Sequence, residues 1–134
     1  MALIASLQFG DNDTLRYSKE YLVSDVRCRL QRRHNSLYVD SDARCERLEV
    51  TVLAPGKDDL TLLDWYVNQS LLSGRVVISL PNEAKLDVTD TKEIRFEDAR
   101  CFQLNERYDI EDGRRMMTLA IESSATIIDN YQFQ

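Results

Sequence analysis

The chain has 134 residues, of which 43% are hydrophobic and 30% charged, with only four glycines and two prolines. This length and composition fit one globular domain over 1–134 with a single core, and they exclude a long disordered or low-complexity segment. The formal net charge of −6 means that most of the surface would repel a phosphate backbone, so nucleic acid is not an expected partner.

The longest unbroken apolar run is the N-terminal "MALIA". It is too short to cross a bilayer and carries no basic n-region, so the sequence predicts neither membrane insertion nor a signal peptide. We therefore expect a protein that is cytoplasmic when it is made.

Alternation of apolar and polar residues with a period of two dominates the chain and predicts antiparallel strands with one wet face. The predicted strands cover 2–9, 15–30, 47–53, 75–80, 85–89, 93–109, 115–123 and 126–129. The residues expected to face inward are Leu3, Ala5, Leu7, Phe9, Val26, Cys28, Leu30, Leu48, Val50, Val52, Met117, Leu119 and Ile121. A longer connection over 34–47, without glycine or proline, is expected to be functional or to order against a partner.

The segment "PGKDDLTLLDWYVNQSLLSGR" departs from this alternation and predicts one helix over about 59–72. Asp58 or Asp59 would cap its first turn and Gly74 would end it. An apolar stripe at helical spacing is expected to face the core: it consists of Leu60, Leu63, Val67 and Leu71. The residues expected to pack partly buried beside it are Trp65 and Tyr66. The predicted fold is mainly β, a small antiparallel β-barrel with one flanking α-helix.

The strand "EIRFEDARCFQLNERYD" over 93–109 changes its inward face twice. Phe96 alternates with charged residues, but the apolar positions resume one place late after the adjacent acids Glu97 and Asp98, and they shift again at Phe102. Register shifts of this kind are produced by β-bulges, which are common where barrels bend and where strand edges meet partners. We therefore expect a bulged strand at a contact surface.

No catalytic, cofactor or metal motif is present in the sequence. The single histidine, His34, lies among arginines and polar residues, which is typical of a surface position. The cysteines Cys28, Cys45 and Cys101 are widely and irregularly spaced, which excludes a disulfide framework and a zinc site. We expect Cys28 and Cys101 to be reduced core residues, and we expect the protein to be neither an enzyme nor a cofactor carrier.

Charge is unevenly spread along the chain. Basic residues gather in "VRCRLQRRH" and acidic residues over 93–98 and 106–112. These clusters are either solvated strand faces or two halves of a self-complementary surface.

Two stretches taken in order resemble the Hcp (TssD) tube proteins of type VI secretion systems in Bacteroidetes. The first is the helix, turn and strand "LLDWYVNQSLLSGRVVISL", and the second is the bulged strand with its hairpin, "IRFEDARCFQLNERYD", followed by "MMTLAIESSATII". The cysteine in "VRCRLQRRH" also lies where that family has one. The resemblance covers about 3–128 and differs at "NSLYVDSDARCERLEV", which lacks the glycines and proline usual in the family.

The resemblance implies a small β-barrel with the fold of phage tail tubes, assembled into hexameric rings that stack into a hollow tube. The implied partners are other copies of the chain, the sheath and spike proteins of the apparatus, and effectors in the lumen. The tube would assemble in the cytoplasm and be exported through the apparatus. The difference over 34–47 leaves open a specialised position, such as one near an end of the tube.

In such a ring, an acidic strand of one subunit would meet the basic strand of the next, with Phe96 and Cys101 facing the core. The candidate interface residues are Arg27, Arg29, Arg32, Arg33, Tyr38, Asp40, Glu97, Asp98 and Arg100. Two other functions stay open from the residues alone: a small β-barrel module that binds a peptide or protein, and an enzyme of a type that the sequence does not reveal.

Overall fold

The computed structural model describes residues 4–31, 44–81, 84, 89–129 and 131–133. Within these residues the elements are β1 (Ile4–Asp11), β2 (Arg16–Gln31), β3 (Arg44–Leu53), α1 (Thr61–Asn68), β4 (Leu72–Pro81), β5 (Thr89–Asp109), β6 (Arg114–Glu122), β7 (Ala125–Ile128) and β8 (Tyr131–Phe133). The predicted strand over 85–89 lies outside the described residues except for its last position. The predicted connection over 34–47 is shorter than expected, because β3 already begins at Arg44.

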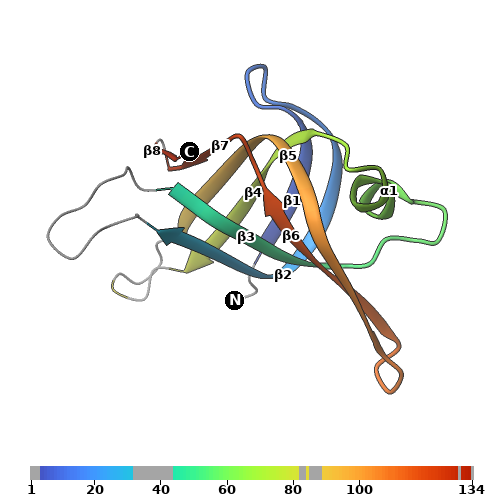
Figure 1. Ribbon diagram of the computed structural model, residues 1–134. Coiled ribbons are helices and arrows are strands. Elements are labelled where there is room, and N and C mark those ends of the chain that lie inside the picture. Colours follow the sequence, from blue (N-terminus) through green and yellow to red (C-terminus); the bar gives the residue numbers. More distant parts are fainter. Residues whose placement is uncertain (1–3, 32–43, 82–83, 85–88, 130, 134) are drawn as a thin grey trace, which may run out of the picture.

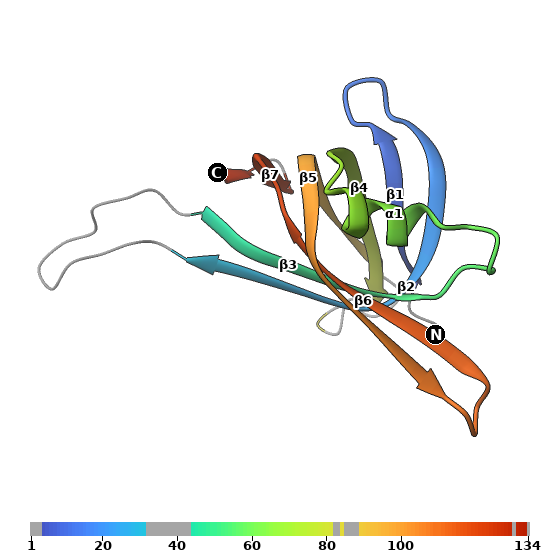
Figure 2. The ribbon, with the colours of Figure 1, turned by 45° about the vertical axis from the view of Figure 1, so that its right-hand side comes forward.

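Six strands form a closed antiparallel ring in the order β4-β1-β2-β3-β6-β5, which closes because β4 also pairs with β5. The short strands β7 and β8 extend the sheet from β5. The helix α1 lies against one side of the ring, and the β5–β6 hairpin projects beyond it (Figures 1 and 2). The predicted mainly β, antiparallel fold with one flanking helix is confirmed.

The core lies inside the strand ring and follows the predicted alternation closely. Leu3 lies outside the described residues and Ala5 is half-buried. The other predicted inward positions of β1, β3 and β6 are buried: Leu7, Phe9, Leu48, Val50, Val52, Met117, Leu119 and Ile121. The prediction is wrong for Leu30, which is 47% exposed, whereas Val26 and Cys28 are half-buried against the core. Leu30 lies next to the last residue of β2, and the ends of β2 and β3 extend past the other strands of the ring (Figure 2).

The helix is shorter than predicted and turns a different face to the core. Its inward residues are Leu62 and Trp65, each 1% exposed, whereas the predicted inward stripe and Tyr66 are exposed: Leu60, Leu63, Tyr66, Val67 and Leu71. The Trp65 indole decides the orientation, because it stacks against Phe96 and its Nε1 donates a hydrogen bond to the carbonyl of Ala99, 2.9 Å away. A two-turn helix can bury only one of its faces. Because the face with Trp65 is buried, the predicted aliphatic stripe faces outward.

The helix also ends earlier than predicted. Gln69 takes a left-handed conformation (φ 53°) and ends α1, whereas Gly74 lies in β4. Gly74 has a different role, because an added Cβ would lie 2.1 Å from the Gln8 carbonyl oxygen of β1. Only glycine lets β4 approach β1 this closely.

At the start of α1, Asp59 supplies the predicted carboxylate one residue before the N-cap Leu60. Its Oδ1 accepts the backbone N–H of Thr61 at 3.0 Å, and its other oxygen accepts the Tyr21 hydroxyl at 2.9 Å. Burial alone would raise the pKa of Asp59, but hydrogen bonds from Thr61, Tyr21 and Lys19 outweigh it and lower this pKa to about 2. Burial likewise raises the pKa of Tyr21 to about 12.

Both predicted register shifts of β5 are present. Against β4, Phe96 pairs with Gly74 but Ala99 pairs with Leu72, so one extra residue is inserted around Asp98, whose φ is 46°. Against β6, a second shift lies between Cys101 and Gln103. The first bulge marks the place where β5 leaves β4 and begins to pair with β6, so one strand belongs to both halves of the ring.

Candidate subunit interface

The first bulge of β5 is held by side chains from two turns. The buried Asn12 amide nitrogen lies 3.1 Å from the carbonyl of Gly74, 3.2 Å from that of Phe96 and 2.9 Å from Oε1 of Glu97. The Ser124 backbone N–H and hydroxyl both donate to the Glu97 carbonyl, at 3.1 and 3.0 Å. The Glu97 side chain, a predicted interface residue, is half-buried and held within its own subunit.

Asp98 and Arg100 lie at the surface beside this bulge. The backbone N–H of Asp98 donates to the Ser73 hydroxyl at 3.0 Å, while its carboxylate is exposed. Both residues line an open pocket of about 440 Å³ together with Leu71, Glu122, Ser123 and Ser124. The structure thus brings Asp98 and Arg100 together on an accessible surface of mixed charge.

The basic strand β2 lies elsewhere on the ring. Arg27 is exposed and forms an ion pair with Asp25 at 3.2 Å, and the exposed Arg29 lies opposite Arg47 of β3 in the sheet register. Because β3 and β6 lie between β2 and β5 in the ring, the two charged clusters do not meet within one subunit. The predicted interface residues Arg32, Arg33, Tyr38 and Asp40 lie outside the described residues.

Arg47 connects β3 to β5 through contacts that the sequence did not indicate. Its Nε pairs with Glu49 at 3.1 Å, and its Nη2 donates to Gln103 of β5 at 2.9 Å. The guanidinium also lies over the Phe102 ring, 5.4 Å from its centroid. Such contacts on the outer face tie β3 to the part of β5 that follows the bulges.

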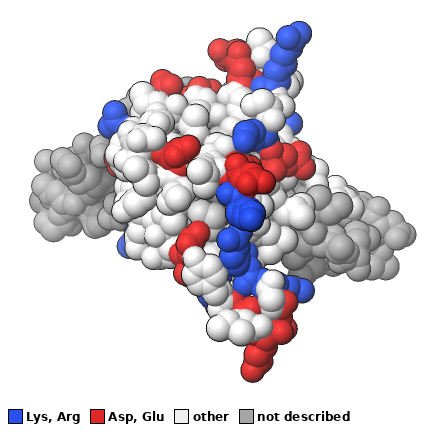
Figure 3. Space-filling view, turned by 90° about the vertical axis from the view of Figure 1, so that its right-hand side faces the viewer, with Lys and Arg blue, Asp and Glu red and all other residues white. Residues whose placement is uncertain are grey.

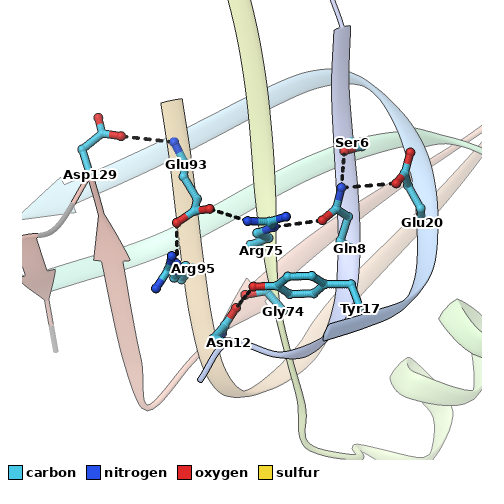
Figure 4. A network of polar contacts seen from close by, with 10 residues as sticks. All are labelled: Ser6, Gln8, Asn12, Tyr17, Glu20, Gly74, Arg75, Glu93, Arg95 and Asp129. Carbon is cyan, nitrogen blue, oxygen red and sulfur yellow. Dashed lines mark hydrogen bonds and ion pairs between the residues drawn. The ribbon is translucent and has the colours of Figure 1, made fainter. Parts of the chain in front are cut away.

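A polar network covers the outer face of β1, β4 and β5 around Arg75 (Figure 4). The Arg75 guanidinium donates to Gln8 at 2.8 Å and to Glu93 at 2.7 Å, and it stacks on Tyr17 at 4.2 Å from the ring centroid. The second carboxylate oxygen of Glu93 binds Arg95. Burial raises the pKa of Tyr17, so this phenol stays neutral at physiological pH.

The network continues to the C-terminal part of the chain through Asp129. Its carboxylate accepts the backbone N–H of Glu93 at 3.1 Å, and this hydrogen bond lowers the pKa of Asp129. Sequence reasoning did not single out these residues. The polar, outward positions of the alternating strands could have pointed to them, because Gln8, Arg75 and Glu93 all occupy such positions on neighbouring strands.

Among the described side chains, the cysteines are as expected. Cys28 and Cys101 are reduced cysteines, half-buried and fully buried respectively. Burial raises the pKa of Cys101 to about 11, so its thiol is protonated and unreactive at neutral pH.

Within the described residues, no group of three histidine, cysteine, aspartate or glutamate side chains is arranged to hold a metal ion. In the same part of the chain, no helix has the length and apolar character needed to span a membrane. The geometry is that of a protein with charged and polar outer faces and a bulged strand at its surface.

These features define a class of mainly β proteins in which a closed antiparallel strand ring carries one short helix. Solved structures share the fold. Hcp1 from Flavobacterium johnsoniae superposes with a TM-score of 0.69 at 19% identity, covering 98% of both chains. The secreted protein Hcp3 from Pseudomonas aeruginosa has a TM-score of 0.64 at 9% identity, covering 95% of this chain and 90% of that one. The baseplate of the anti-feeding prophage contains a chain with a TM-score of 0.52 at 16% identity, covering 94% and 91%.

Comparison of the sequence with models of protein families identifies the family. The family model described as hemolysin coregulated protein Hcp (TssD) matches residues 1–134. The chain belongs to this family, the tube proteins of type VI secretion systems, as its sequence resemblance predicted. A comparison with curated protein sequences finds no significant match.

Proposed function

We propose that this chain is the inner-tube subunit of a type VI secretion system, closing into hexameric rings that stack into a hollow tube for effector delivery. The observation that carries the proposal is the family match over residues 1–134. The tube would assemble in the cytoplasm, be enclosed by sheath proteins, carry a spike, and leave the cell through the apparatus. The role requires neither catalysis nor a cofactor.

The arrangement of strands supports ring closure by copies in one repeated orientation. The pairing of β5 with β4 ends at Ala99, and its pairing with β7 covers Ile94–Glu97. Among the described residues, Gln103–Asp109 therefore has a partner strand on one side only, β6. Proteins commonly cover such open strand edges, and a neighbouring copy would do so here.

The two charged clusters also support a ring. A cyclic ring uses two different surfaces of each subunit, and the basic β2 and acidic β5 occupy opposite positions in the order of the strand ring. Arg27 and Arg29 of one copy would then approach Asp98 of the next. Exposed ion pairs are each worth about 0–1 kcal/mol, so they would set register while apolar burial stabilises the ring.

The test is native mass spectrometry combined with negative-stain microscopy of the purified protein. We expect hexamers and rings with an open centre. Raising the salt concentration should loosen the assembly more than it lowers the stability of the subunit, because exposed charges are screened. A stable monomer at high protein concentration would contradict the proposal and favour the alternative, a small β-barrel module that binds a peptide or protein.

A further inference from the structure

The β5–β6 hairpin ends in an apolar side chain where a polar one is usual. The turn spans Ile110–Gly113, is closed by Gly113 at φ 66°, and is held by a hydrogen bond from the Asp112 N–H to Asp109 Oδ1 at 3.1 Å. Ile110 in this turn is 92% exposed, and the turn is the projecting end of the hairpin (Figure 1). Turns normally carry polar residues. Because Ile110 is almost fully exposed, it adds nothing to the subunit core and is available to contact another molecule.

A groove of about 250 Å³ lies between the outer part of the same hairpin, around the Tyr108–Arg115 pair, and the start of α1. Its floor contains the buried Leu62 and Met117, and its rim carries the exposed side chains of Leu60, Leu63 and Tyr108. A cavity of about 150 Å³ can hold a benzene ring. The groove therefore has room for an aliphatic side chain such as isoleucine.

The charges around the tip and the groove are complementary. Acidic side chains gather at the end of the hairpin, with basic side chains above them on the same face (Figure 3). The tip acids are Asp109, Glu111 and Asp112, and with the adjacent Arg114 the tip is acidic on balance. The groove is lined by the basic residues Lys57 and Arg115. Of its two acids, Asp59 is paired with Lys19, whereas Glu106 accepts a hydrogen bond from the Tyr108 hydroxyl, which does not cancel its charge. Lys57 and Arg115 together outweigh Glu106, so the groove is basic on balance.

We propose that the hairpin tip of one subunit, centred on Ile110, seats in the groove beside α1 of a second copy of this chain. The tip cannot reach its own groove, because Tyr108 and Arg115 of the same hairpin line that groove and the two strands stay paired from Leu104 to Asp109. The contact joins two different surfaces and so repeats from copy to copy. This contact rests on the proposed assembly, and it identifies two surfaces through which neighbouring copies would bind each other.

The first test is disulfide trapping between two singly substituted proteins. Ile110→Cys is mixed with Leu60→Cys, oxidised, and analysed on a non-reducing gel. The matched control mixes Ile110→Cys with Leu15→Cys, a similarly exposed leucine (56%) in the β1–β2 turn. We expect a linked dimer in the first mixture at least several-fold above the control. Equal yields in both mixtures, or none in either, would overturn the contact.

The second test measures assembly of Ile110→Asp by sedimentation and microscopy, with Leu15→Asp as control. We expect association about tenfold weaker for Ile110→Asp, the scale of a central apolar contact, with thermal unfolding of the subunit unchanged. If unmodified protein forms no rings, the tube function fails. If unmodified protein forms rings and Ile110→Asp assembles equally well, only the hairpin contact is wrong.

Discussion

The two halves of β5 belong to one continuous strand but have different surroundings. From Ile94 to Cys101 the inward positions are almost completely buried, with Phe96 and Cys101 both 0% exposed. In Gln103–Asp109, Leu104 is half-buried and most other side chains are exposed. The first half is enclosed by β4, β7 and α1, whereas among the described residues the second half pairs with one strand, β6. The first half of β5 therefore contributes to the core of the subunit, and the second half is accessible to other molecules.

Replacing Trp65 should give the largest effect, because it removes the side chain that joins α1 to the enclosed half of β5. We expect Trp65→Ala to lower the free energy of unfolding by about 3–5 kcal/mol, from the lost burial and the cavity that remains. The neighbouring Tyr66→Ala, at an exposed position, is the control and should cost much less. Urea denaturation measures both, and equal losses would contradict the observed orientation of the helix.

Removing the Asn12 side chain should come next. Asn12→Ala leaves the carbonyls of Gly74 and Phe96 without this donor, so we expect a loss of about 1–3 kcal/mol. The control is Asn105→Ala in the exposed half of β5, which should stay within about 0.5 kcal/mol of the unmodified protein. If both variants unfold at the same urea concentration, Asn12 does not stabilise the bulge.

The carboxylate at the start of α1 predicts a pH effect. Because the pKa of Asp59 is lowered to about 2 in the folded protein, its stabilisation is present above its ordinary pKa near 3.8 and is lost as the pH falls toward 2. At pH 7, Asp59→Ala should cost about 1 kcal/mol, and the difference should shrink between pH 4 and pH 2. Thermal unfolding across this range, with the exposed Asp58→Ala as control, measures it. A difference independent of pH would contradict the assignment.

The smallest effect is expected at the second bulge. Phe102→Leu removes the ring beneath the Arg47 guanidinium, so we expect a loss of about 0.5–1 kcal/mol. In an Arg47→Gln background the same substitution should cost less, and a double-mutant cycle by urea denaturation gives the difference. No coupling between the two positions would show that the contact contributes nothing.

Much of the fold could be predicted from sequence because strand burial is periodic. Alternation correctly gave the inward residues of β1, β3 and β6, and the interruption at Glu97 and Asp98 correctly gave the first bulge. In a closed sheet each strand has one inward face, so the sequence of that strand is enough to identify it. For the candidate interface the sequence identified the charged clusters, and the structure places Asp98 and Arg100 together at the surface.

Sequence alone therefore determined the class of fold, the core strands, the bulged strand and, through its resemblance, the family. Only the tertiary structure decided which face of α1 is inward and which polar residues surround Arg75. An eight-residue helix is too short for its own periodicity to fix its orientation, so packing of Trp65 against Phe9 and Phe96 fixes it instead. Likewise, Gln8, Arg75 and Glu93 are distant in sequence, and they meet only because β1, β4 and β5 pair side by side.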